Sequence, residues 1–261
     1  MKIYDLSLPI DDNAPEPFPV KVERTGHGEG GDRVGEKLFQ PGKKKLDRNC
    51  FPDGIFLSHE SVTASVHCGT HVDAPYHFGP ECEGSSSMMV DDLPLEWYYS
   101  DGVVLDMTHK TAGSEIITDD LLAALTKIDY TLKPSDIVLI RTDADRHFGT
   151  PAYSKNFPGV AVSAIEYLLD NGIKVIGIDA VSFDRPFLSM LDDYDKSGDN
   201  RHLWPAHILG RRRQYSHIER LANLGSLPRP HGFKFACFPV KIKGAGAAWA
   251  RAVAIFEDQE D

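Results

Sequence analysis

The segment HCGTHVDAP, residues 67–75, places two histidines and an aspartate within seven positions, and His77 follows shortly after it. Imidazole nitrogens and carboxylate oxygens together suit zinc, manganese or iron. The intervals of four, two and four residues from His67 to His71, Asp73 and His77 allow a strand followed by a turn to bring these side chains together. We therefore predict a metal site here; the alternative is a polar loop whose histidines are satisfied by their neighbours.

His77 differs from the other three residues in position, because it lies beyond Pro75. A divalent ion activates water and polarises a carbonyl group, but a reactive site also needs a group that carries a proton to the leaving atom. One of the four residues is then this catalytic acid or base rather than a ligand; His77 is the natural candidate, with His67, His71 and Asp73 as candidate metal ligands.

A second set of ligand-type residues lies in PAHILGRRRQYSHIERL, residues 205–221, which contains His207 and Glu219 with His217 between them. An imidazole and a carboxylate would meet the needs of a second ion, and Asp73 could bridge both ions through its two oxygens. The alternative is that Glu219 opens an amphipathic helix, IERLANL, and is simply exposed there.

The composition limits the classes of partner. The chain has 261 residues, 41% of them hydrophobic, and a formal net charge of −11, so its surface repels nucleic acid phosphates and anionic membranes. We expect no nucleic acid or membrane partner and, since no leader or membrane-length apolar run is evident, a cytoplasmic location. The four cysteines form no CxxC pair, which argues against a thiolate zinc site or a disulfide framework.

Strand-like and helix-like segments alternate along the chain, which predicts a mixed α/β fold with helices flanking a sheet. Thr118 and Ser163 are candidate N-caps of the two helices. The predicted strands are 2–8, 61–67, 102–107, 136–143 and 174–184, with two more in 232–244 and 250–258, and the predicted helices are 118–129 and 163–173.

Residues 25–55 are rich in glycine and charge and have weak periodicity, which predicts a long loop. We interpret this loop as a lid or a dimer arm. The rest of the chain shows no internal repeat, so we predict a single domain over residues 1–261.

The segment HCGTHVDAPYH, residues 67–77, resembles the HxGTHxDxPxH signature of the cyclase-like metal-dependent hydrolases, the family of bacterial kynurenine formamidase and isatin hydrolase. The resemblance covers most of the chain apart from residues 25–55 and 185–205. It implies the mixed-sheet, swivelling β/α/β-like fold of that family and one or two ions of Zn2+ or Mn2+. The implied roles are the first metal for His67, His71 and Asp73, catalysis for His77, and the second metal for His207 and Glu219 with Asp73.

The resemblance implies a hydrolase that cleaves a C–N bond of a small amide or lactam through a metal-bound hydroxide. An aromatic compound is one candidate substrate, and the family implies a homodimer or homotetramer. A lactone or ester hydrolase, a metal-dependent cyclase or dehydratase, and a metal-binding protein without turnover are the alternatives. Ala250 stands before Arg251 where the family commonly has proline, and Trp249 is a candidate to line the pocket, so kynurenine formamidase in particular is less favoured.

Overall fold

The computed structural model describes residues 1–257. Contacts divide the chain into two compact units, one made of residues 1–15 and of the chain from residue 66 onward, the other of residues 16–65. Each unit is described by itself, and a single domain over the whole chain stays a prediction. No helix within residues 1–257 combines the length and the apolar character that a bilayer span requires.

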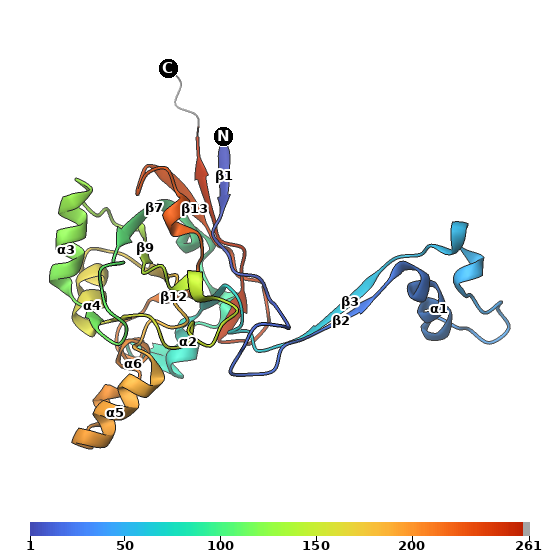
Figure 1. Ribbon diagram of the computed structural model, residues 1–261, viewed down its shortest axis with the longest axis horizontal. Helices are drawn as coiled ribbons and strands as arrows, with labels where there is room; N and C mark the ends of the chain where they lie inside the picture. The colour runs from blue at the N-terminus through green and yellow to red at the C-terminus, as the bar shows by residue number, and fades with distance from the viewer. Residues whose placement is uncertain (258–261) are drawn as a thin grey trace. The chain divides into compact units, whose positions relative to one another are not determined.

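The larger unit is built on a mixed sheet, which confirms the predicted fold class (Figure 1). Strands β7, β9, β11 and β12 run parallel to one another in the centre, and antiparallel strands complete both edges. In spatial order the nine strands are β1 (Lys2–Asp5), β15 (Val253–Phe256), β13 (Phe233–Ala236), β7 (Tyr99–Asp106), β9 (Ile137–Arg141), β11 (Val175–Ile178), β12 (Ser216–Glu219), β4 (His71–Asp73) and β14 (Ala247–Trp249).

Alternate residues of the central strands supply two separate cores. On β9, Val138 and Ile140 pack into the core beneath the helices, whereas Ile137 and Leu139 pack into the core on the opposite face. A strand that is buried on both faces has a continuous apolar sequence, as IVLIR of β9 does. Helices α3 (Thr118–Lys127) and α4 (Val162–Asp170) contact each other and cover the first of these cores (Figure 1).

Both predicted long helices form, but the predicted caps are wrong. The N-cap residues are Ile117 and Ala161, so Thr118 lies inside the first turn of α3 rather than before it. The carboxylate of Asp120 accepts the amide of Ile117 at 2.8 Å and takes over the capping of α3. The other α-helices among the described residues of this unit are α2 (Pro75–Phe78), α5 (Phe187–Ser197) and α6 (Pro205–Leu209).

The two predicted strands at the end of the chain correspond to β13 and β15, although Asp258 of the prediction lies outside the described residues. Strand β14 was not predicted. Short pairs complete the strands of this unit, and these are β5 (Glu81–Cys82) with β6 (Ser85–Ser86) and β8 (Glu115–Ile116) with β10 (Gly159–Val160).

The smaller unit corrects the prediction of a long loop over residues 25–55. Strands β2 (Lys21–Thr25) and β3 (His59–Thr63) pair as antiparallel neighbours, and helix α1 (His27–Lys37) forms within the segment read as loop. The glycines that suggested a loop are a packing face: a Cβ at Gly35 would lie 1.6 Å from the carbonyl oxygen of Leu46. The predicted strand 61–67 contributes to β3 only as far as Thr63.

Candidate metal centre

Two neighbouring strands carry four of the ligand-type side chains. On β4, His71 and Asp73 alternate with Val72 and therefore share one face; on β12, His217 and Glu219 share a face in the same way. The antiparallel register sets His217 opposite Asp73 and Glu219 opposite His71. Paired positions on one face are close neighbours, so this register alone brings two imidazoles and two carboxylates together.

This arrangement overturns the interpretation of Glu219 as the start of an exposed helix. Glu219 is the last residue of β12, a strand buried in all four positions between β11 and β4. An isolated carboxylate in such a place is costly unless it is paired or binds a metal.

The remaining predicted residues approach from loops and short helices. His67 lies before β4, His77 lies on α2, and His207 lies on α6. The Nδ1 atom of His67 is 3.0 Å from Oδ1 of Asp73. The ring centre of His77 is 4.3 Å from that of His67 and 5.4 Å from that of His207. The structure thus gathers all six residues predicted from the sequence.

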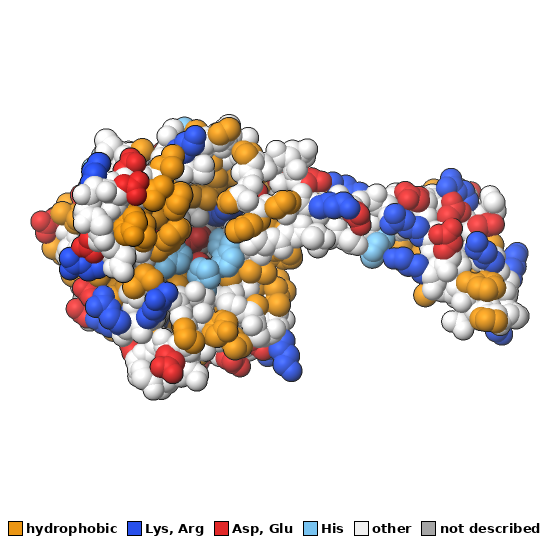
Figure 2. All heavy atoms as spheres, turned by 90° about the horizontal axis from the view of Figure 1, so that it is seen from below, with side chains coloured by type: hydrophobic (Ala, Val, Ile, Leu, Met, Phe, Trp, Pro, Cys, Tyr) orange, Lys and Arg blue, Asp and Glu red, His pale blue; other side chains and the backbone are white. Residues whose placement is uncertain are grey.

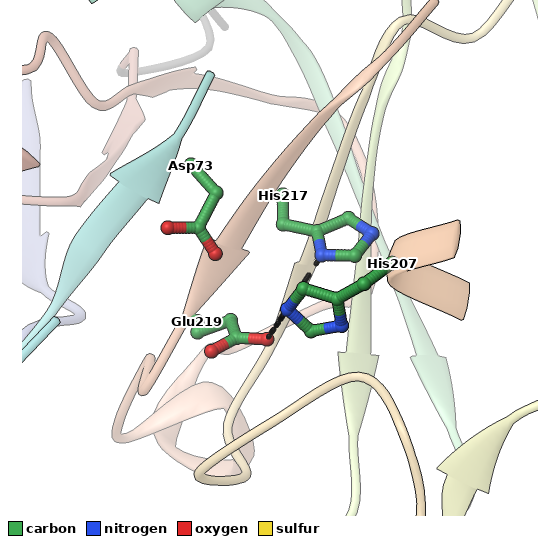
Figure 3. Close-up of side chains that lie close together, drawn as sticks. All are labelled: Asp73, His207, His217 and Glu219. Atoms are coloured by element: carbon green, nitrogen blue, oxygen red, sulfur yellow. Dashed lines mark ion pairs between the residues drawn. The ribbon is translucent and has the colours of Figure 1, made fainter. Parts of the chain in front are cut away.

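The carboxylate of Glu219 points toward the rings of His207 and His217, as Figure 3 shows. Its Oε1 is 3.6 Å from Nε2 of His207 and 3.9 Å from Nδ1 of His217. Its Oε2 is 3.7 Å from Nε2 of His71, which is also 3.5 Å from Oδ1 of Asp73. One ligand atom each from Asp73, His207, His217 and Glu219 can be chosen so that all four lie within 4.8 Å of one another. Nothing in the sequence marked His217 as a ligand beyond its place between two predicted ligands.

Hydrogen bonds at the back of the rings fix which nitrogen faces the cluster. His71 donates from Nδ1 to the carbonyl oxygen of Gly69 at 2.9 Å, and His207 donates from Nδ1 to Oδ2 of Asp184 at 2.6 Å. In the neutral form of each imidazole this donation leaves the Nε2 lone pair facing the carboxylates, as metal binding requires. Sequence analysis missed Asp184, although it ends the predicted strand 174–184.

Burial shifts the ionisation of the carboxylates and of His207. Burial, together with the nearby Asp73 carboxylate, raises the pKa of Glu219 to about 7. Burial opposes a charge on His207 as well, but the hydrogen-bonded Asp184 carboxylate outweighs it and raises the pKa of His207 to about 9. Burial also opposes a charge on Asp73, yet the surrounding histidines, led by His71, hold the pKa of Asp73 well below its usual range.

His71 and His77, which have no direct hydrogen bond to a carboxylate, behave differently. Desolvation lowers the pKa of His71 to about 4, and it lowers the pKa of His77 to about 4 with help from the neighbouring His67 and His207. Both imidazoles are therefore neutral near pH 7, so each has a lone pair available for a metal or a proton.

The donor set fits a divalent cation. Several buried atoms, namely Nε2 of His71, Nδ1 of His217 and Oδ2 of Asp73, have no hydrogen-bond partner among the described residues. Unpaired buried polar atoms are rare and costly in native proteins, and a divalent ion would satisfy these atoms together. A set of imidazole nitrogens and carboxylate oxygens without thiolate suits both Zn2+ and Mn2+.

The cluster is accessible from outside the larger unit. Figure 2 shows histidine side chains around an acidic side chain in a hollow of the surface, with hydrophobic side chains along the rim. A hollow with an apolar rim and a polar floor is the usual form of a small-molecule site.

At Ala250 the sequence differs from the resembled family pattern, and the residues around this position lie at a cavity of their own. Trp249 and Ala250 line a cavity of about 560 Å³ together with Thr70, and Arg251 forms an ion pair with Asp5 at 2.6 Å. Trp249 is also opposite His71 in the register of β14 with β4. A role for Trp249 in substrate binding stays a prediction.

Comparisons with known proteins identify relatives of this chain. Residues 4–185 match the Cyclase family model, described as "Putative cyclase". An isatin hydrolase of Roseibium aggregatum is 28% identical over 212 residues, 78% of this chain and 76% of its own. A kynurenine formamidase of Maricaulis maris is 30% identical over 192 residues, 74% of this chain and 78% of its own.

Solved structures show the same fold. The crystal structure of an isatin hydrolase bound to the product analogue thioisatinate matches with a TM-score of 0.73 at 22% identity, over 98% of this chain and 93% of that one. A structure described as a potential metal-dependent hydrolase with cyclase activity matches with a TM-score of 0.62 at 22% identity, over 98% of both chains.

The chain therefore belongs to the Cyclase family. The family resemblance predicted from the signature at residues 67–77 is confirmed. The prediction of an enzyme of the hydrolase class is confirmed by the relatives, which are named as hydrolases or formamidases.

Proposed function

We propose that this protein is a metal-dependent hydrolase that cleaves the C–N bond of a small amide or lactam. The observation that carries the proposal is the buried cluster in which imidazole nitrogens and carboxylate oxygens converge, with Nε2 of His71, Nδ1 of His217 and Oδ2 of Asp73 lacking hydrogen-bond partners among the described residues. The names of the relatives, isatin hydrolase and kynurenine formamidase, support this substrate class, since isatin is a lactam and a formamidase acts on an amide.

The residues divide into two ligand sets that share Asp73. His67, His71 and Asp73 would hold one ion, and Asp73, His207 and Glu219 would hold another. Divalent ions in these places would polarise the substrate carbonyl group and lower the pKa of a bound water. Zn2+ and Mn2+ both suit the donors, and the number of ions, one or two, is part of the proposal's test.

His77 is the proton carrier in this proposal. Its imidazole is neutral near pH 7, because desolvation lowers the pKa of His77 to about 4, so a ring nitrogen can accept the proton of the attacking water. The water oxygen bonds to the carbonyl carbon and the C–N bond breaks. His77 then returns the same proton to the leaving nitrogen, so that the ring ends in its starting state.

The test combines metal content with a substrate panel. Purified protein is analysed for zinc and manganese and then assayed for acid release from isatin, N-formylkynurenine, simple lactams and matched lactones. We expect bound metal and turnover of an amide or lactam. Turnover confined to lactones would favour the ester-hydrolase alternative instead. Loss of water from a hydroxylated carbonyl compound would favour the dehydratase alternative. Stoichiometric metal without turnover of any compound would favour a metal-binding protein.

Paired variants assign the chemistry to the cluster. His77→Ala is compared with His109→Ala, whose side chain is 63% exposed and serves as a matched histidine control. We expect turnover to be lost in the first and kept in the second.

Three further proposals concern assembly and location. The protein forms a homodimer or homotetramer, with residues 25–55 as an arm, which light scattering tests. It is cytoplasmic, which cell fractionation tests.

A further inference from the structure

His217 is held rigidly beside the cluster by aromatic packing. The side chain is fully buried, and its ring stacks on Phe183 with centres 4.0 Å apart and planes 18° apart. The ring of Phe78 lies 4.7 Å away on another side. With these contacts and a place on β12, the imidazole has one orientation, in which Nδ1 faces Glu219 and Nε2 faces Tyr215.

The hydroxyl of Tyr215 determines where the proton of His217 resides. This hydroxyl is 2.7 Å from the carbonyl oxygen of Ala206, and a carbonyl can only accept, so Tyr215 donates its single proton there. The 2.7 Å contact between the hydroxyl and Nε2 of His217 must then be a donation from Nε2. A neutral imidazole has one N–H, so Nδ1 of His217 presents a lone pair.

This lone pair has no hydrogen-bond partner among the described residues, although Nδ1 is buried. Its nearest carboxylate oxygen, Oε1 of Glu219, is 3.9 Å away, which is too far for a hydrogen bond. A tetrahedral ion with bonds of about 2.1 Å holds its ligand atoms about 3.4 Å apart. The set Asp73, His207, His217 and Glu219, within 4.8 Å of one another, is close to that spacing.

We infer that His217 is a ligand of the second metal ion through Nδ1, and that the Tyr215 hydroxyl is the positioning group that fixes its tautomer. The second ion is then held by two imidazoles and two carboxylates. The alternative is that His217 only fills the core. In that case its buried Nδ1 stays unpaired among the described residues, and the hydrogen bond to Tyr215 has no effect on metal binding.

The inference rests on the proposed metal-dependent function and is tested by metal binding rather than by activity. Metal-free protein is titrated with Zn2+ by calorimetry, and bound zinc is counted by elemental analysis after dialysis. The variants are His217→Phe, which keeps an aromatic ring between Phe183 and Phe78, and Tyr215→Phe, which removes only the hydroxyl. Tyr98→Phe is the matched control, because it also removes one buried hydroxyl. That hydroxyl donates to Ser216, which lies on β12 next to His217.

We expect His217→Phe to lose the second zinc or to bind it at least about tenfold more weakly, and Tyr215→Phe to weaken it by about 10- to 100-fold. Tyr98→Phe should bind zinc within about twofold of the wild type. X-ray absorption at the zinc edge should count one imidazole fewer in His217→Phe.

Wild-type zinc affinity and an unchanged imidazole count in a folded His217→Phe protein would overturn the inference. If that variant does not fold, Tyr215→Phe decides, and wild-type affinity in it would overturn the inference equally. A wild-type protein that binds no zinc or manganese would refute the proposed function itself, which is a different result from wild-type affinity in the variants.

Discussion

Replacing Asp184 by asparagine tests most sharply how the chain positions His207 for the proposed second metal ion. The carboxylate accepts three donors, Nδ1 of His207 at 2.6 Å, the amide of Ala206 at 2.7 Å and the amide of His207 at 3.2 Å. An asparagine side chain has one oxygen instead of two, and its NH2 group cannot accept from Nδ1. Loss of such an outer partner weakens metal binding by about 10- to 100-fold, which is about 1.4 to 2.7 kcal/mol.

The assay is calorimetric titration of metal-free Asp184→Asn with Zn2+, next to a urea denaturation of the same protein. Because Asp184 is buried, loss of its charged hydrogen bonds should also lower the free energy of unfolding, by about 1 to 3 kcal/mol. Asp199→Asn is the control, since Asp199 caps the short helix Asn200–His202 by accepting the amide of Arg201 at 2.9 Å. Zinc affinity of Asp184→Asn equal to that of the control would refute the argument that Asp184 positions His207.

Three further predictions concern catalysis, a helix cap and packing. His77→Ala should lower kcat by about 10²- to 10⁴-fold with metal content unchanged; a variant stripped of metal would make His77 a ligand instead. Although desolvation opposes it, the hydrogen bonds from Lys110 and Ile117 lower the pKa of Asp120, so Asp120→Asn should cost about 1 kcal/mol of stability at pH 7. A carboxyl group with a lowered pKa stabilises the folded protein only while it is ionised. The difference in unfolding free energy between the wild type and Asp120→Asn should therefore shrink below about pH 4. A difference that stays constant with pH would contradict this prediction. Gly210→Ala places a Cβ 2.1 Å from Cδ2 of Phe78. This overlap should lower the free energy of unfolding by about 1 to 3 kcal/mol, measured as a lower midpoint of urea denaturation. An unchanged midpoint would show that the Phe78 ring moves aside without cost.

The sequence predicted the part of the site that is local. His67, His71, Asp73 and His77 lie within eleven positions, so a strand of three residues and a short helix that starts at Pro75 are enough to gather them. Alternation along a strand places His71 and Asp73 on one face whatever the rest of the fold does.

The part of the site that depends on strand register could not be predicted from the sequence. The role of His217 follows from its place opposite Asp73 in β12, a pairing between distant segments of the chain. The sequence IERLANL has apolar residues at helical intervals, but only its first two residues belong to β12, which is buried on both sides. Periodicity cannot separate such a short buried strand from a helix.

Two other misses have physical causes of a similar kind. Asp184 acts on His207 because the start of α6 docks beside it, which is a tertiary contact. Glycine content suggested a loop at residues 25–55, but Gly30 and Gly35 instead allow α1 to approach the backbone of Leu57 and Leu46. Glycine serves close backbone approach as well as flexibility, and the sequence does not distinguish the two.

Metal removal and restoration tests the central claim most directly. The purified protein is treated with a chelator, dialysed, and assayed on the amide or lactam that it hydrolyses before and after addition of one and two equivalents of Zn2+ or Mn2+. We predict that chelation abolishes hydrolysis and that stoichiometric metal restores it. Full hydrolysis by metal-free protein would contradict the account, because the cluster of histidines and carboxylates would then have no part in the reaction.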